Sequence, residues 1–382
     1  MAMLGFLNNT HFDHGAISQL PAALATLGIR RPLLCTDPGL MKIGLVDQVR
    51  AELPGDLDVT LFADTPENPT EQAVNAAATR YREAACDGLI AVGGGSSMDL
   101  AKAVALAVTH DAPLIDLTAG RGGAARIGPV APLIAVPTTA GTGSEVSSGA
   151  VVIMDNGEKL ILVSRHLVPP IAICDPDLTL GLPAGLTAAT GMDAVTHCIE
   201  AVLSPAINPP AEAVGLDGLQ RALGAGHLRR AVRDGQDRDA RWHMMMASTE
   251  GAMAFSKGLG AVHSMSHAAG ALGQLRLHHG TLNALFLPTI LRFNDGAVGN
   301  KYDRIRAAAG LDAATDLAEF IEQLNAEIGL PPDIGALGIT EAMIPALAAH
   351  AARDVCSFTN PRPCSEADFV TLYEQALGAG RA

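Results

Sequence analysis

The hydrophobic positions follow one pattern in the first half of the chain and another in the second. In the first half, short apolar runs alternate with segments of helical composition, and each run ends at a turn or a glycine-rich loop. This alternation predicts an α/β domain with a mostly parallel sheet and helices on both faces. Two more runs, 150–154 and 159–163, flank Asn156-Gly157 and predict a hairpin. The other predicted strands lie at 32–35, 58–62, 88–92, 132–136 and 170–174.

The pattern changes after Leu182-Pro183-Ala184-Gly185. Strand signals fade, and long amphipathic or wholly apolar helical segments continue to the end of the chain. The 382 residues are enough for two domains, each with its own core. We therefore expect an α/β domain over 1–182 and an all-α domain over 183–382. The cleft between two such domains is the expected place for chemistry.

Composition and charge exclude several classes of protein. Hydrophobic residues make up 48 % of the chain and charged residues 17 %, and the net charge is −14. No excess of basic residues is available to neutralise phosphates, so we expect no nucleic-acid partner. The N-terminus lacks the features of a signal peptide, and no apolar run reaches about 18 residues, so we expect no membrane span. The six cysteines form no CxxC pair, which favours a reduced, cytoplasmic protein.

Two loops of small residues each follow a predicted strand. The first, Gly93-Gly94-Gly95-Ser96-Ser97, leads into a helix, and the second covers 138–144. Glycines let a backbone approach a pyrophosphate closely, and a helix N-terminus offers free N–H groups to it. The pair of loops predicts nucleotide binding, although the common G-x-G-x-x-G fingerprint does not follow the first strand. Asp99 suits the positive end of the helix dipole, so it is open to a purely structural interpretation.

Four histidines and one aspartate between 193 and 279 have spacings typical of metal ligands. Asp193 and His197 are four residues apart, as are His263 and His267, and His279 follows in a loop. Residues at i and i+4 of a helix share one face, so two helices can direct these side chains to one point. A mixed nitrogen and oxygen set suits Fe(II) or Zn(II). The spacing alone leaves all five residues as candidates, and it leaves open that they are ordinary core or surface residues.

The motifs together resemble those of the iron-containing (group III) alcohol dehydrogenases, which share the dehydroquinate-synthase-like superfold. The resemblance covers nearly the whole chain. It implies an N-terminal dinucleotide-binding domain, a C-terminal helical domain and a metal at their interface. The matching segments are GGGSSMDLAKA (93–103), PTTAGTGSEVS (137–147), GMDAVTHCIEA (191–201), GLGAVHSMSHAAGALG (258–273), HGTLNALFLP (279–288) and DVCSFTNPR (354–362).

The resemblance assigns separate roles to the candidate ligands. It implies that Asp193, His197, His263 and His279 bind the metal. His267 is similar to a histidine that relays a proton, a task suited to the imidazole group near neutral pH. This chain departs from the family before the last ligand, where a slightly longer segment brings an additional histidine, His278, as an alternative to His279.

The resemblance also implies a set of cofactor-binding residues. Asp37 occupies the place of an acidic residue that accepts hydrogen bonds from the adenosine ribose, and a carboxylate there favours NAD over NADP. Lys159 belongs to the set, but the hairpin pattern alone predicts an exposed lysine. The other positions of this set are Asn68, Gly94, Gly95, Ser96, Asp99, Thr138, Thr139 and Thr142.

The function implied is reversible hydride transfer between a small alcohol and NAD, with a divalent metal, Fe(II) before Zn(II). The protein would then be a homodimer or larger homo-oligomer that acts on small alcohols or aldehydes. Three alternatives remain: a metal-independent maleylacetate-reductase-like enzyme, a dehydroquinate-synthase-like lyase, and a non-catalytic nucleotide- or metal-binding protein. The substrate stays open, with Gly149, Phe255, Cys356 and Phe358 as candidate pocket residues.

Overall fold

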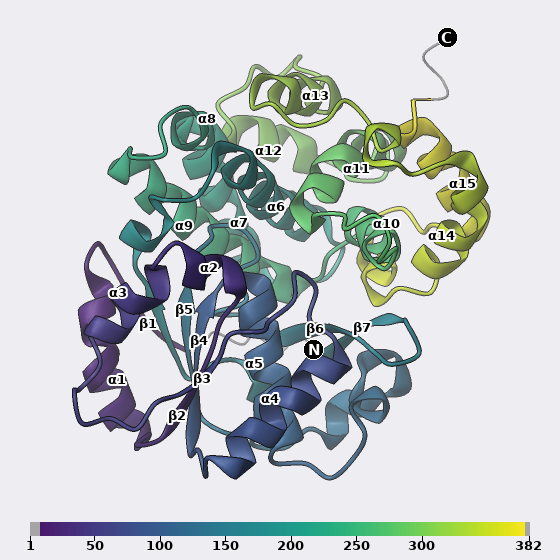
Figure 1. The fold of residues 1–382 in the computed structure, drawn as a ribbon. Helices are drawn as coiled ribbons and strands as arrows, with labels where there is room; N and C mark the ends of the chain where they lie inside the picture. Colours follow the sequence, from purple (N-terminus) through teal and green to yellow (C-terminus); the bar gives the residue numbers. More distant parts are fainter. Residues whose placement is uncertain (1–7, 379–382) are drawn as a thin grey trace. The chain divides into compact units, whose positions relative to one another are not determined.

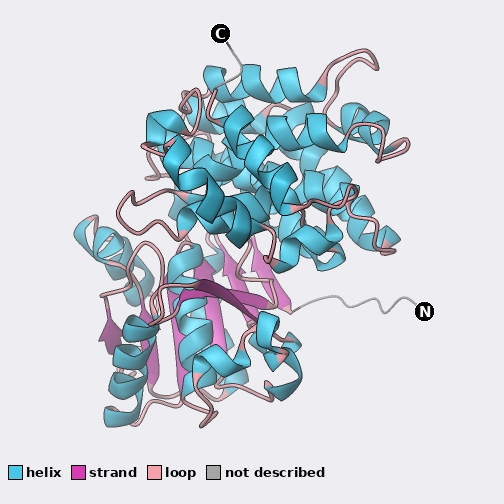
Figure 2. Ribbon diagram, turned by 90° about the vertical axis from the view of Figure 1, so that its right-hand side faces the viewer, coloured by secondary structure: helices cyan, strands magenta, loops and turns pink. Residues whose placement is uncertain are grey.

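The computed structural model describes residues 8–378, which form two compact units. The sheet unit comprises 8–139 and 144–180, and the helical unit comprises 140–143 and 181–378. All strands of the described residues, magenta in Figure 2, belong to the sheet unit. The predicted fold class, an α/β domain with a mostly parallel sheet followed by an all-α part, is confirmed.

The sheet unit is built on six parallel strands in the order β1-β8-β5-β4-β2-β3. A separate antiparallel ribbon, β6 (Gly149–Ile153) and β7 (Lys159–Val163), is the predicted hairpin. The sequence pattern missed β1 because three of its four residues, NTHF, are polar and the strand is partly exposed at the sheet edge. The six strands are β1 (Asn9–Phe12), β2 (Pro32–Cys35), β3 (Thr60–Phe62), β4 (Gly88–Gly93), β5 (Leu133–Pro137) and β8 (Ile171–Cys174).

Helices cover both faces of this sheet, and alternate strand residues fill two separate cores. Leu33 and Leu89 point toward the core formed with α4 and α5, whereas Leu34 and Ile90 point toward the core formed with α1 and α3. Central strands buried on both faces are therefore apolar throughout, as the pattern predicted. The helices, also seen in Figure 1, are α1 (Leu20–Leu27), α2 (Pro38–Lys42), α3 (Leu45–Ala51), α4 (Glu71–Glu83) and α5 (Gly95–Ala107).

Buried polar bonds attach α5 to the segment that leads into β6. Asp99 accepts hydrogen bonds from the Ser144 hydroxyl at 2.6 Å and from the Val151 N–H at 2.9 Å. One turn later, fully buried Lys102 donates to the carbonyls of Ser147 at 2.9 Å and Gly149 at 2.8 Å. Burial lowers the pKa of Lys102 to about 8, since the charged form loses its hydration. No pattern in the sequence predicted that Lys102 is buried.

The helical unit surrounds α6 (Ala184–Leu203), whose residues are almost all buried. Helix α6 packs against α7, α9 and α11, and α10 packs against both α11 and α14. A helix that is buried on every side forms the centre of a core. The other helices are α7 (Pro209–Leu219), α8 (His227–Arg233), α9 (Arg238–Ala254), α10 (Ala261–Gly270), α11 (His279–Asn294), α12 (Lys301–Ala308), α13 (Leu317–Glu327), α14 (Ile344–Ala351) and α15 (Glu366–Ala376).

The segment 140–143 packs with the helical unit because its glycines touch helices of that unit. A Cβ atom on Gly141 would lie 2.7 Å from the Thr190 carbonyl oxygen, and one on Gly143 would lie 2.1 Å from the Ala252 side chain. Gly143 also has a φ of +59°, which favours glycine. The predicted single boundary near Pro183 did not include this segment. Within residues 8–378, every helix is too short or too polar to cross a lipid bilayer.

Replacing Lys102 with methionine should destabilise the sheet unit. The apolar side chain leaves the Ser147 and Gly149 carbonyls without their donor, and we expect the free energy of unfolding to fall by about 3 kcal/mol. Urea unfolding followed by circular dichroism measures this loss. The matched control is Lys42→Met, because Lys42 is exposed at the end of α2. Equal unfolding midpoints for the two variants would contradict the assigned role.

Candidate metal centre and cofactor loops

Three helices of the helical unit supply the candidate ligands. Asp193 and His197 lie one turn apart on α6, and His263 and His267 lie one turn apart on α10. His279 is the first residue of α11. The i, i+4 spacing therefore places each pair on one helix face, as predicted. Asp193 and His263 are each 1 % exposed, so their polar atoms are shielded from water and need partners inside the protein or a bound ion.

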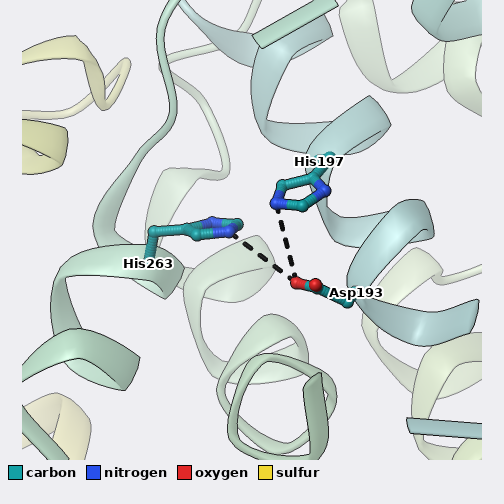
Figure 3. Close-up of side chains that lie close together, drawn as sticks. All are labelled: Asp193, His197 and His263. Carbon is teal, nitrogen blue, oxygen red and sulfur yellow. Dashed lines mark ion pairs between the residues drawn. The ribbon is translucent and has the colours of Figure 1, made fainter. Parts of the chain in front are cut away.

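Three imidazole nitrogens converge on one carboxylate oxygen. Figure 3 shows two of them, from His197 and His263, with Asp193. Oδ1 of Asp193 lies 3.6 Å from Nε2 of His197 and 3.9 Å from Nε2 of His263. Nε2 of His279 lies 3.7 Å from the same oxygen. The ligands of a tetrahedral ion with bonds of about 2.1 Å are about 3.4 Å apart. These separations are therefore close to those a single ion requires.

The amide of Asn283 shows that this group has a surplus of acceptors. Its nitrogen lies 2.7 Å from Oδ1 of Asp193 and 3.2 Å from Nε2 of both His263 and His279. An NH₂ group has two hydrogens, so it cannot serve three acceptors. The oxygen of the same amide is buried without a hydrogen bond. Several lone pairs directed at one point are what a cation satisfies, so the donor set fits a divalent metal.

The protonation of the histidines also fits a metal. Burial lowers the pKa of His197 to about 4, which keeps this ring neutral, the form that binds metals. Glu200 lies 2.5 Å from Nδ1 of His263 and accepts the Val262 N–H at 2.8 Å. Burial opposes protonation of His263, but Glu200 outweighs it and raises the pKa of this ring. A proton held on Nδ1 by Glu200 leaves Nε2 free to bind.

Glu200 was not predicted as a site residue, although its spacing from Asp193 and His197 indicates that it shares their helix face. Glu200 lies three residues after His197 and seven after Asp193 on the same helix. Those intervals place all three side chains on one face of α6. The partner His263 is 63 residues away in the chain, so only the fold shows what Glu200 contacts.

His267 has a different partner. Its Nδ1 lies 2.9 Å from Oδ2 of Asp354, and its ring stacks on that of His279 with centroids 5.5 Å apart. Burial disfavours the charged Asp354, but the neighbouring His267 outweighs this and holds the pKa of the carboxyl well below its usual range. The ionised Asp354 accepts the Nδ1 proton, which leaves Nε2 of His267 as a base. Asp354 was not a candidate in the sequence.

The two histidines that precede the last helix differ in exposure. His279 lies at the centre described above, with a side chain 25 % exposed, the most open of the four ligands. His278 is exposed and stands at the N-cap of α11. The structure therefore brings His279 to the centre.

Two other groups of potential ligands are explained without a metal. His267, Asp354 and Cys356 lie close together, but burial raises the pKa of the Cys356 thiol well above its ordinary value, and thiols bind metals as thiolates. In the second group, His227, Asp239 and His243, Asp239 already pairs with Arg230 at 2.9 Å. Both groups therefore act as internal polar networks.

The expected cofactor residues gather at the carboxyl ends of strands in the sheet unit. Gly94 is the N-cap of α5 and packs against Thr139, which brings the two small-residue loops together. Gly93 has a φ of +150° and lies against Ser97, so a side chain would not fit there. Glycines and a helix N-terminus at this edge can approach a phosphate closely. Gly95 and Ser96 open α5, and Thr138 donates its N–H to the Gly93 carbonyl.

Three of the expected residues have structural partners of their own. Asp37 caps α2 by accepting the Leu40 N–H at 3.0 Å, which leaves its other oxygen for a further partner. Lys159 is 8 % exposed and donates to Asn68 at 2.9 Å, so the hairpin lysine is buried rather than exposed. Thr142 lies in the segment grouped with the helical unit. Asp99, described above, bonds to backbone and hydroxyl groups.

The candidate pocket residues divide by exposure. The Phe255 ring lies 5.0 Å from the ring of His197, so it borders the metal centre directly. Phe358 is 76 % exposed, Cys356 is buried, and Gly149 begins β6 with its carbonyl bound to Lys102. Of these, Phe255 has the clearest place beside the centre.

Known proteins are similar to this chain over nearly its whole length. Residues 8–176 match the model of the iron-containing alcohol dehydrogenases, and residues 187–377 match the model of the C-terminal part of that family. A 4-hydroxybutyrate dehydrogenase of Cupriavidus necator is 52 % identical, with 99 % of this chain and 100 % of the relative aligned. A 1,3-propanediol dehydrogenase of Citrobacter freundii is 37 % identical over 97 % of each chain. The solved structure of a 1,3-propanediol oxidoreductase superimposes with a TM-score of 0.91 and 34 % identity, covering 98 % of this chain and 100 % of that one.

Substitution of Glu200 with glutamine should weaken metal binding. The neutral amide no longer holds the Nδ1 proton of His263 electrostatically, and partners of this kind are worth about 10- to 100-fold in metal affinity. Titration of the purified protein with Zn(II) against a chelator of known affinity measures the change. The control is Glu341→Gln, since Glu341 is exposed. An affinity equal to that of the control would remove Glu200 from the site.

Proposed function

Because the chain belongs to the iron-containing alcohol dehydrogenase family and is an alcohol oxidoreductase, we propose that it oxidises small alcohols with NAD at a divalent metal centre. The reverse reaction reduces the aldehyde. The observation that carries the proposal is the convergence of three imidazole nitrogens on the Asp193 carboxylate. The proposed metal ligands are Asp193, His197, His263 and His279.

A divalent ion at these ligands supplies Lewis acidity, which lowers the pKa of an alcohol hydroxyl, and NAD supplies the hydride acceptor. The protein orients the groups and handles the proton. Nε2 of His267 accepts the proton that leaves the hydroxyl, because Asp354 holds the other ring nitrogen protonated. The buried surroundings exclude water, which strengthens the electrostatic interactions at the centre.

The proposed metal is Fe(II), with Zn(II) as the alternative. One carboxylate and three imidazoles form a ligand set that both ions accept, so availability of the metal decides between them. In the proposed site the thiols take no part, since burial raises the pKa of both Cys198 and Cys356.

The proposed cofactor is NAD rather than NADP. One oxygen of Asp37 caps α2, and the other would accept from the ribose hydroxyls while the charge repels a 2′-phosphate. The two small-residue loops would hold the pyrophosphate. The remaining proposed contacts are Asn68, Gly94, Gly95, Ser96, Asp99, Thr138, Thr139, Thr142 and Lys159.

The relatives indicate the kind of alcohol. 4-Hydroxybutyrate and 1,3-propanediol, named in two of them, each end in a primary alcohol on a short chain. We therefore propose short primary alcohols as substrates. We also propose that the protein acts in the cytoplasm as a homo-oligomer, in keeping with its six free cysteines and with the family.

The alternative functions explain fewer of these contacts. A metal-independent reductase of the maleylacetate type needs no convergent ligand set. A lyase of the dehydroquinate synthase type would need a cluster of basic residues for a phosphorylated acidic substrate, and the sequence of the C-terminal half has no such cluster. A protein that only binds nucleotide or metal gives the His267–Asp354 pair no task. The dehydrogenase reaction uses both features.

Removal of single histidines should separate metal binding from proton transfer. We expect His279→Ala to lose bound metal and activity together, because one of four ligands is gone. His267→Ala should retain the metal while alcohol oxidation falls by about 10²- to 10⁴-fold. Metal analysis and NADH formation measure the two properties on the same samples. His278→Ala is the matched control, and loss of metal in that variant with retention in His279→Ala would reverse the assignment.

The substitution Asp37→Ser should relax the choice between NAD and NADP. Serine still caps α2 through its hydroxyl, so the helix is kept while the charge is removed. We expect the ratio of kcat/KM for NAD to that for NADP to fall by at least about tenfold, the effect of losing one close charge repulsion. Steady-state assays with both cofactors measure it. An unchanged ratio would show that another group sets the preference.

A further inference from the structure

The loop between α10 and α11, residues 271–278, joins two helices that carry metal ligands (Figure 1). Two of its leucines anchor it, since Leu277 is buried and Leu275 packs beside Gly338. Arg276, between them, is exposed. Its φ of +46° is in the left-handed region, which among the described non-glycine residues is shared only by Ala85. The loop therefore holds a defined conformation that keeps Arg276 at the surface.

The guanidinium group of Arg276 has no partner among the residues that the structure describes. Within residues 8–378 it makes no hydrogen bond and no ion pair. Other arginines of the helical unit, such as Arg221, Arg230 and Arg292, pair with carboxylates. A planar fork of five N–H donors left without an acceptor is suited to a carboxylate from outside the chain.

Arg276 also lies close to the metal centre along the chain. It precedes the proposed ligand His279 by three positions, so their Cα atoms are at most about 11 Å apart. No side chain caps the N-terminus of α11, which His279 begins, and this end of the helix dipole also favours an anion. At this separation, the long arginine side chain can extend to the far end of a short substrate whose hydroxyl lies at the centre.

We propose that Arg276 binds the carboxylate of an ω-hydroxycarboxylate of about four carbons and so selects this substrate class. The inference rests on the proposed function, because the other end of the substrate must react at the metal centre. The same class of substrate appears in the name of a relative that is 52 % identical, a 4-hydroxybutyrate dehydrogenase. The contact with Arg276 also answers a problem of charge: a chain with a net charge of −14 needs a local cation to hold an anionic substrate.

The test compares two alcohols of equal length that differ in the far group, 4-hydroxybutyrate and 1,4-butanediol. With the metal-loaded enzyme and NAD, we expect Arg276→Gln to lower kcat/KM for 4-hydroxybutyrate by about 10- to 100-fold, mainly through KM. The value for 1,4-butanediol should change by less than about threefold, since a neutral end makes no ion pair. Arg276→Lys should recover part of the loss because it keeps the charge.

Two matched variants remove an arginine elsewhere in the helical unit. Arg233→Gln removes an exposed charge at the end of α8 and should affect neither substrate. Arg353→Gln removes the other unpaired arginine near the centre, next to Asp354. If Arg353→Gln and not Arg276→Gln shows the selective loss, the assignment to Arg276 is overturned. Equal losses for both substrates in Arg276→Gln would also overturn it, because they indicate damage to the centre itself.

The wild-type enzyme separates this inference from the function on which it rests. Oxidation of 1,4-butanediol without oxidation of 4-hydroxybutyrate contradicts the carboxylate site and leaves the proposed alcohol dehydrogenase intact. Failure of the metal-loaded protein to oxidise any short primary alcohol contradicts the proposed function itself. Oxidation of both, with the selective loss in Arg276→Gln, supports the inference.

Discussion

The helical unit depends on the interactions that compensate the buried carboxylate of Asp193. A carboxylate that is 1 % exposed must be compensated by neighbouring groups. Here the compensation comes from imidazoles on three helices and from the amide of Asn283. The compensation sets which faces of α6, α10 and α11 meet. The surplus of lone pairs that results is unfavourable inside a protein unless a cation is present, so the architecture of the core and the capacity to hold a metal have the same origin.

Around this centre, His263 and His267 are each oriented by a carboxylate from elsewhere in the chain. Glu200 lies at Nδ1 of His263, whose Nε2 faces Asp193, whereas Asp354 lies at Nδ1 of His267. We propose that the first ring binds the metal and that the second acts as a base. The chemical difference between a ligand and a proton carrier, four residues apart on α10, thus depends on where the second ring nitrogen finds its partner. Identical side chains acquire separate roles through their neighbours rather than through their positions in the motif.

The sequence predicted those features that depend on local spacing. Alternation of apolar runs predicted the parallel sheet, and the i, i+4 intervals placed Asp193 with His197 and His263 with His267. It could not predict contacts between distant segments, such as His267 with Asp354, 87 residues apart, or the burial of Lys102 and Lys159. The edge strand β1 was not predicted because three of its four residues are polar. Charged side chains look exposed in a sequence, and only tertiary packing reveals the acceptors that allow them to be buried. The substrate selection that we propose depends on a loop with no regular pattern, where function commonly varies within a family.

The most direct test of the account is X-ray absorption spectroscopy at the metal edge of protein loaded with one equivalent of Fe(II) or Zn(II). The account predicts one ion per chain with a shell of nitrogen and oxygen atoms only, at about 2.0–2.2 Å, and with the scattering pattern of three imidazoles. A sulfur atom at about 2.3 Å, or an ion that binds without histidine ligands, would contradict it.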